Sequence, residues 1–133
     1  MPDRRPPKEY AMRNTVAITQ GCYFFITGIW PLFSIGTFQM VTGRKTDLWL
    51  VKTVGLVLAV IGATLFMAGA RAEVTLSTAL LAVGSAAGLA GIDIVYAGKK
   101  VISSVYLLDA VLEAALIIWW GVVLLLQPQS AIF

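Results

Sequence analysis

The sequence has no histidine and only one cysteine, Cys22, among its 133 residues. Without a second cysteine the chain cannot form an internal disulfide or a Cys-x-x-Cys redox pair. Without histidine it lacks the usual ligands of haem, zinc and di-iron sites. We therefore expect no metal and no cofactor. Because Cys22 stands among Gly21, Tyr23 and Phe24, we interpret it as a small buried apolar residue and not as a reactive thiol.

Charged side chains are also scarce. They make up 13% of the chain, whereas hydrophobic residues make up 59% and the mean hydropathy is +0.85. These values lie outside the range of soluble globular domains. All of the Lys and Arg residues except Lys52 flank long apolar segments instead of forming a basic stripe. The net charge of +3 is therefore attributed to membrane topology, and we expect no nucleic-acid partner.

Four apolar segments are each long enough to cross the hydrocarbon core of a bilayer, which takes roughly 20 helical residues. They cover residues 16–41, 48–70, 74–97 and 102–126. Because the connections are short, the sequence predicts an all-α membrane protein. We expect an up-and-down bundle of four transmembrane helices within residues 15–133, preceded by a polar, basic tail at residues 1–14. Pro31 lies inside the first segment and predicts a kink there.

Rows of small residues let helices approach one another closely in lipid. Two of the predicted helices carry such rows, namely Gly55, Ala59 and Gly62 in residues 48–70, and Gly84, Gly88 and Gly91 in residues 74–97. We therefore expect these two helices to form the closest contact at the centre of the bundle.

The distribution of basic residues also predicts the orientation of the chain. Four of them, Arg4, Arg5, Lys8 and Arg13, precede the first predicted helix, and two, Arg44 and Lys45, follow it. Positive residues concentrate on the cytoplasmic side of membrane proteins. We therefore expect a multi-pass protein of the bacterial plasma (inner) membrane with both termini in the cytoplasm.

Four ionisable side chains lie inside the predicted spans, where a charge is expensive and marks a candidate site. With a rise of ~1.5 Å per residue, Lys52, Asp93 and Asp109 lie at a similar depth below the same membrane face. Glu113 lies one turn deeper on the same side of its helix as Asp109, and Gln39 belongs to the same half of the bilayer. We hypothesise that these five residues form a proton- or cation-binding site.

Lys52 is expected to supply the counter-charge of this site. It shares a side of its helix with Gly55 and Ala59, so we expect it to point into the bundle and to pair with a carboxylate. Three carboxyls against one lysine leave a surplus of two negative charges. We therefore expect at least one acid, Glu113, to hold a proton or to accept a cation. The alternative is that the same groups only hold the helices together by interhelical hydrogen bonds.

The sequence favours an interaction protein over a catalyst. It is short, has no soluble domain and contains no catalytic triad or nucleotide-binding loop. We expect a non-enzymatic accessory or assembly subunit whose partners are the lipid bilayer and another protein or a second copy. In the adjacent pair Trp119 and Trp120 at least one ring is expected to face outward. The alternative is a proton-linked small-solute transporter or ligand-binding protein that uses the ionisable residues, and a membrane-embedded acid/base enzyme such as an isomerase is third.

Overall fold

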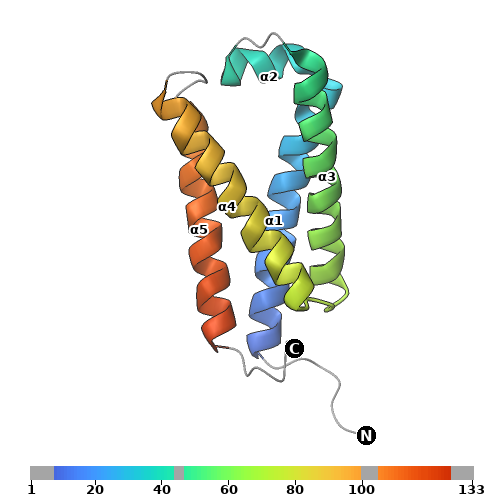
Figure 1. Cartoon of the computed structure of the whole chain (residues 1–133). Coiled ribbons are helices and arrows are strands. Elements are labelled where there is room, and N and C mark those ends of the chain that lie inside the picture. Colours follow the sequence, from blue (N-terminus) through green and yellow to red (C-terminus); the bar gives the residue numbers. More distant parts are fainter. Residues whose placement is uncertain (1–7, 44–46, 100–104, 127–133) are drawn as a thin grey trace, which may run out of the picture.

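The computed structural model describes residues 8–43, 47–99 and 105–126 (Figure 1). These residues form α1 (Lys8–Phe33), α2 (Ile35–Thr42), α3 (Leu48–Ala70), α4 (Leu76–Gly98) and α5 (Val105–Leu126). The helices α1, α3, α4 and α5 are each long and apolar enough to cross a membrane. The described part of the chain is therefore all-helical, and it has four candidate membrane spans, as a multi-pass membrane protein has.

The observed helix bounds agree with the predicted spans except in the first segment. The helix α3 has the predicted bounds, and α4 starts two residues later than predicted. The predicted span 16–41 is divided into α1 and α2, and the break lies at Ser34 instead of at Pro31. Pro31 removes a backbone donor and crowds the preceding turn, and α1 ends within one turn after it. At the other end α1 begins at Lys8, so the second half of the predicted tail is helical.

Parts of two predictions fall outside the described residues. These parts are residues 1–7 of the predicted tail and residues 102–104 of the last predicted span.

The short helix α2 lies across one end of the long helices (Figure 1). The indole Nε1 of Trp30 donates a hydrogen bond to Thr37 Oγ1 at 3.0 Å. The ring of Trp30 also packs edge-on against Phe38, with 5.4 Å between the ring centroids. Phe38 is buried, whereas Met40 on the same helix is exposed. One face of α2 is therefore fixed to α1, and the other carries exposed apolar side chains.

The closest helix contact joins α1 to α3 through opposed glycines. Gly21 on α1 faces Gly62 on α3, and Gly28 faces Gly55. A methyl group added at Gly21 would lie 2.7 Å from the carbonyl oxygen of Gly62, and one added at Gly55 would lie 2.5 Å from that of Gly28. The glycines recur every seven residues on both helices, and Gly69 continues the row on α3. The two backbones therefore touch along an antiparallel seam in which any larger side chain would clash.

The expected close contact between the second and third spans is wrong. Added methyl groups at Gly84, Gly88 and Gly91 of α4 would meet nothing within 4 Å, and α4 makes far fewer contacts with α3 than with α5. The physical reason is that α1 already occupies the small-residue face of α3. The glycine spacing alone does not decide this choice, since Gly84, Gly91 and Gly98 of α4 also recur every seven residues.

The long helices form two pairs, α1 with α3 and α4 with α5, and contacts between α1 and α5 join the pairs. The buried apolar core lies in the half of the molecule that holds the first turns of α1 and the last turns of α5. It consists of Val16, Ala17, Phe24, Leu65, Val74, Ala79, Ala82, Ala86, Trp120 and Val123. From the turn that connects them, α3 and α4 diverge toward the end where α2 lies (Figure 1).

Leucine at Gly62 is expected to destabilise the protein, because its side chain would press on the backbone of α1 and force the seam apart. Overpacking of this kind typically costs about 1–3 kcal/mol. The matched control is Gly84→Leu, since Gly84 has open space around it. Thermal unfolding in a mild detergent measures both variants. Equal losses of melting temperature would show that the glycine seam does not set stability.

Candidate functional site

Two groups of polar side chains link the helices, and the first is fully paired. Gln20 on α1 and Trp120 on α5 are both completely buried. Trp120 Nε1 donates a hydrogen bond to Gln20 Oε1 at 2.7 Å, and Gln20 Nε2 donates to the carbonyl oxygen of Ala82 on α4 at 2.9 Å. The amide of Gln20 thus connects α1, α4 and α5, and both its oxygen and its nitrogen have a hydrogen-bond partner. We interpret this group as a structural tie.

The second group, which we call the acid cluster, consists of Tyr23, Asp93, Asp109 and Glu113. The hydroxyl of Tyr23 on α1 donates a hydrogen bond to Asp109 Oδ1 on α5. Asp93 on α4 lies beside Asp109. Glu113 follows Asp109 by one helical turn and therefore lies on the same side of α5. Asp109 is the centre at which side chains from three helices meet.

Two oxygens of the acid cluster are buried without a partner. Only 4% of Asp93 and 1% of Glu113 is exposed, and neither Asp93 Oδ2 nor Glu113 Oε2 has a hydrogen-bond partner. A buried carboxylate is strongly disfavoured unless it is paired. A proton on the carboxyl or a cation beside it removes this penalty. The acid cluster therefore has the chemistry of a proton or cation site.

The structure does not bring the expected lysine to these acids. Lys52 is exposed on α3, and within the described residues it forms no ion pair with any carboxyl. The side of α3 that carries Gly55 packs against the backbone of α1, which leaves no space there for a long side chain. The predicted pair between Lys52 and a carboxylate is therefore not formed in the structure.

The other expected contributors have different positions. Gln39 is half-buried on α2, where its Nε2 donates to the carbonyl oxygen of Ile35 in the same helix at 3.4 Å. The basic residues Arg44, Lys45 and Lys100, which follow the first and third predicted spans and could have supplied a counter-charge, lie outside the described residues. Of the predicted site residues, Asp93, Asp109 and Glu113 are the ones that the structure places together.

The arrangement of the acids does not resemble a metal site. Within the described ranges, no three or more carboxylate or thiol side chains are close enough together to hold a metal ion. Asp109 and Glu113 are displaced from one another along α5 by about 6 Å, so their oxygens do not converge on one point. Proton binding, or binding of a cation that needs no inner ligand shell, fits this geometry better than metal coordination.

Sequence reasoning missed two members of the polar groups. Tyr23 was not recognised as a partner of the acids, although a phenol in the middle of a span needs a hydrogen-bond partner. Trp120 is completely buried, and the neighbouring Trp119 is half-buried, so the outer position belongs to Trp119. The pairing of Trp120 with Gln20 could not be inferred from the sequence, because the sequence does not show which side of α5 faces α1.

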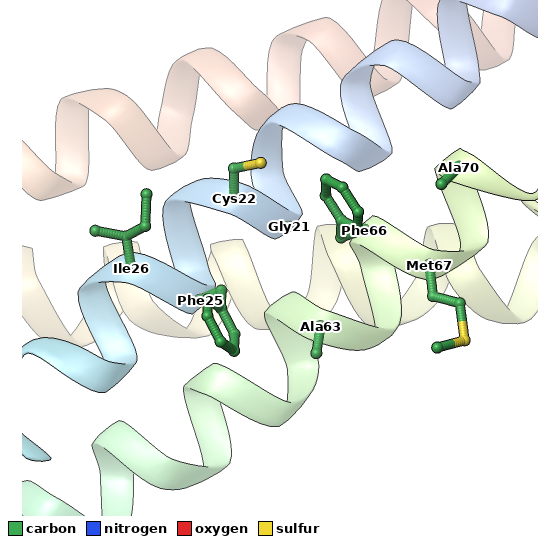
Figure 2. A pocket seen from close by; sticks show the side chains of 8 residues that line it. All are labelled: Gly21, Cys22, Phe25, Ile26, Ala63, Phe66, Met67 and Ala70. Carbon is green, nitrogen blue, oxygen red and sulfur yellow. The ribbon is translucent and has the colours of Figure 1, made fainter.

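Cys22 is exposed, contrary to expectation. It lies at an apolar groove of about 530 Å³ between α1 and α3, together with Phe25, Phe66 and Met67 (Figure 2). Gly21 also lines this groove. The groove contains no charged or hydroxyl side chain that could orient a polar ligand, so we do not assign the candidate site to it.

A double-mutant cycle is expected to show coupling between Gln20 and Trp120. Gln20→Leu leaves the indole N–H unpaired, and Trp120→Phe leaves the amide oxygen unpaired. Interhelical hydrogen bonds in membrane proteins contribute about 0.6 kcal/mol on average and at most about 1.7, so each single variant is expected to lose roughly that much stability. The double variant should lose less than the sum of the two. If the stability losses of the two single variants simply add up in the double variant, measured by unfolding in detergent, Gln20 and Trp120 are not energetically coupled.

Comparisons with known proteins add no homologue to this description. No protein-family model matches the sequence, and neither the curated proteins nor the solved structures searched give a match. The function is therefore argued from the acid cluster and its surroundings.

Proposed function

We propose that the protein is a proton-linked membrane protein whose acid cluster takes up and releases protons while it binds or carries a small solute. In this proposal α1, α3, α4 and α5 cross a bacterial plasma membrane alternately as an up-and-down bundle with cytoplasmic termini. The antiparallel seam between α1 and α3 supports this alternation. The exposed apolar side chains of α2 suit a helix that lies along the membrane face.

One observation carries the proposal, namely the buried unpartnered oxygens of Asp93 and Glu113. If the acids served only to hold the helices together, they would be expected to be paired as Gln20 and Trp120 are. The same protein thus contains a polar tie whose buried atoms are hydrogen-bonded and an acid cluster in which two buried oxygens have no partner. Groups that must gain and lose a proton cannot be permanently paired with a cation, and this requirement explains the difference.

The surroundings of the acids suggest a role for each. Two carboxylates buried side by side repel one another, so one of them is expected to hold a proton. Because Asp109 accepts the hydroxyl of Tyr23 while Asp93 Oδ2 is buried without a partner, we assign this proton to Asp93. Asp109 is half-buried, whereas Asp93 and Glu113 are buried, so it is the most accessible of the three acids. Protons would then enter at Asp109 and reach Glu113 one turn deeper.

An accessory or assembly role is the second candidate. The observation that favours it is the unoccupied row of Gly84, Gly88 and Gly91 on α4. Small-residue rows of this kind pack against other helices in membranes, and α1 and α3 show such packing within this chain. In that case a partner protein would cover α4 and co-purify with the chain in mild detergent.

Substitution of Glu113 by glutamine tests the proton-linked proposal. Infrared difference spectra of the protein in lipid, recorded across a pH series, are expected to show a protonated-carboxyl band that titrates. Glu113→Gln should remove the part of this band that belongs to the deeper acid. The control Glu73→Gln changes an exposed carboxylate that pairs with Arg71 and should leave the band unchanged. If Glu113→Gln and Asp93→Asn both give the spectrum of the unmodified protein at every pH, the acid cluster exchanges no protons.

A further inference from the structure

A second apolar groove lies between α3 and α4, one helical turn from Asp93 along α4. Its volume is about 360 Å³, and its walls include Thr53, Val57 and Ile61 on α3 and Gly88 and Leu89 on α4. The hydroxyl of Thr53 is bonded to its own helix backbone, so the groove surface is effectively apolar. The groove exists because α4 diverges from α3 (Figure 1).

The groove and the acid cluster are neighbours along α4. Leu89 precedes Asp93 by one helical turn, so the two side chains lie on the same side of α4 and about 6 Å apart along its axis. Thr53 lies about 8 Å inside the start of α3, and Asp93 lies about 8 Å inside the end of α4. The upper end of the groove and the carboxyl of Asp93 are therefore at the same depth in the membrane.

We propose that the acid cluster binds the charged head of a membrane-soluble organic cation, such as a quaternary ammonium with an apolar body, which enters sideways through the groove between α3 and α4. This inference rests on the proposed function and names its substrate class. The groove would hold the apolar body, and its volume lies in the range of small-molecule sites. The buried unpartnered carboxyl oxygens of the cluster are complementary to the cationic head.

An organic cation fits these groups better than a metal ion does. The described acids do not form a metal-ligand group, whereas a bulky organic cation is weakly hydrated and requires only nearby negative charge. Each cation that binds displaces one proton from the acid cluster, so the net charge inside the membrane stays constant. Cation binding is therefore expected to be accompanied by the release of a proton, and either one can be measured.

Access to Asp93 requires a small movement, since only 4% of its surface is exposed. The helix α4 has few contacts with α3, and Gly88 has no neighbour within 4 Å of an added methyl group. A small movement of α4 away from α3 at Gly88 would therefore leave the glycine seam between α1 and α3 intact, while Leu89 stays packed against the core.

Binding of radiolabelled tetraphenylphosphonium and dodecyltrimethylammonium to the full chain in lipid nanodiscs tests the proposal. Because the cation competes with one proton, the affinity is expected to rise by up to about tenfold per pH unit over the range where the acids titrate. A pH indicator should report about one proton released per cation bound. Asp93→Asn and Glu113→Gln are each expected to lower both signals.

Two leucine variants on the same helix separate the groove from the helix as a whole. Gly88→Leu fills the groove and is expected to weaken cation binding by at least about tenfold. Gly84→Leu adds the same side chain one turn away, outside the groove, where the space is equally open. It should leave the affinity unchanged. Both variants should keep the titrating infrared carboxyl band.

The outcomes distinguish this inference from the proposed function. If neither cation binds while the carboxyl band titrates, the organic-cation proposal is wrong and the proton-linked function stands. Equal effects of Gly84→Leu and Gly88→Leu would overturn the groove as the route of entry. A carboxyl band that does not titrate in the unmodified protein would overturn both proposals.

Discussion

The backbone contact between α1 and α3 determines where every other helix can lie. Because Gly21 and Gly28 meet Gly62 and Gly55 directly, the small-residue face of α3 is fully used, and α4 packs on α5 instead. The remaining side of α1 is then free to contact α5. That contact brings the polar side chains of α1 to those of α5, so the formation of the acid cluster depends on a seam that contains none of its residues.

The two polar groups solve the same physical problem in different ways. A polar atom in an apolar interior must find a partner or be neutralised. Gln20 finds its partners within the protein, since its amide bonds both an indole and a backbone carbonyl. Asp93 and Glu113 each keep one oxygen without a partner and must be neutralised from outside. The first group therefore adds rigidity, and the second adds a requirement for a proton or cation.

Hydropathy predicted the long helices, because the bilayer sets the length of an apolar span. Periodicity placed Asp109 and Glu113 on one side of α5, and depth placed Asp93 beside them. The position of Lys52 was not predictable in this way, since depth does not fix the rotation of a helix. That rotation follows from the choice of helix partner, and the glycine spacing does not decide it, since glycines recur every seven residues on α1, α3 and α4. The contribution of Tyr23 needed the same information.

The seven-residue repeat of the seam has a consequence for its register. If α1 slid past α3 by seven residues, or about 10 Å, Gly28 would lie opposite Gly62 and glycine would again meet glycine. Glycine spacing alone therefore fits several alignments. Contacts outside the seam must therefore select among these alignments. The attachment of α2 to α1 through Trp30 shortens the free connection between α1 and α3, which favours alignments that keep the beginning of α3 near the end of α1.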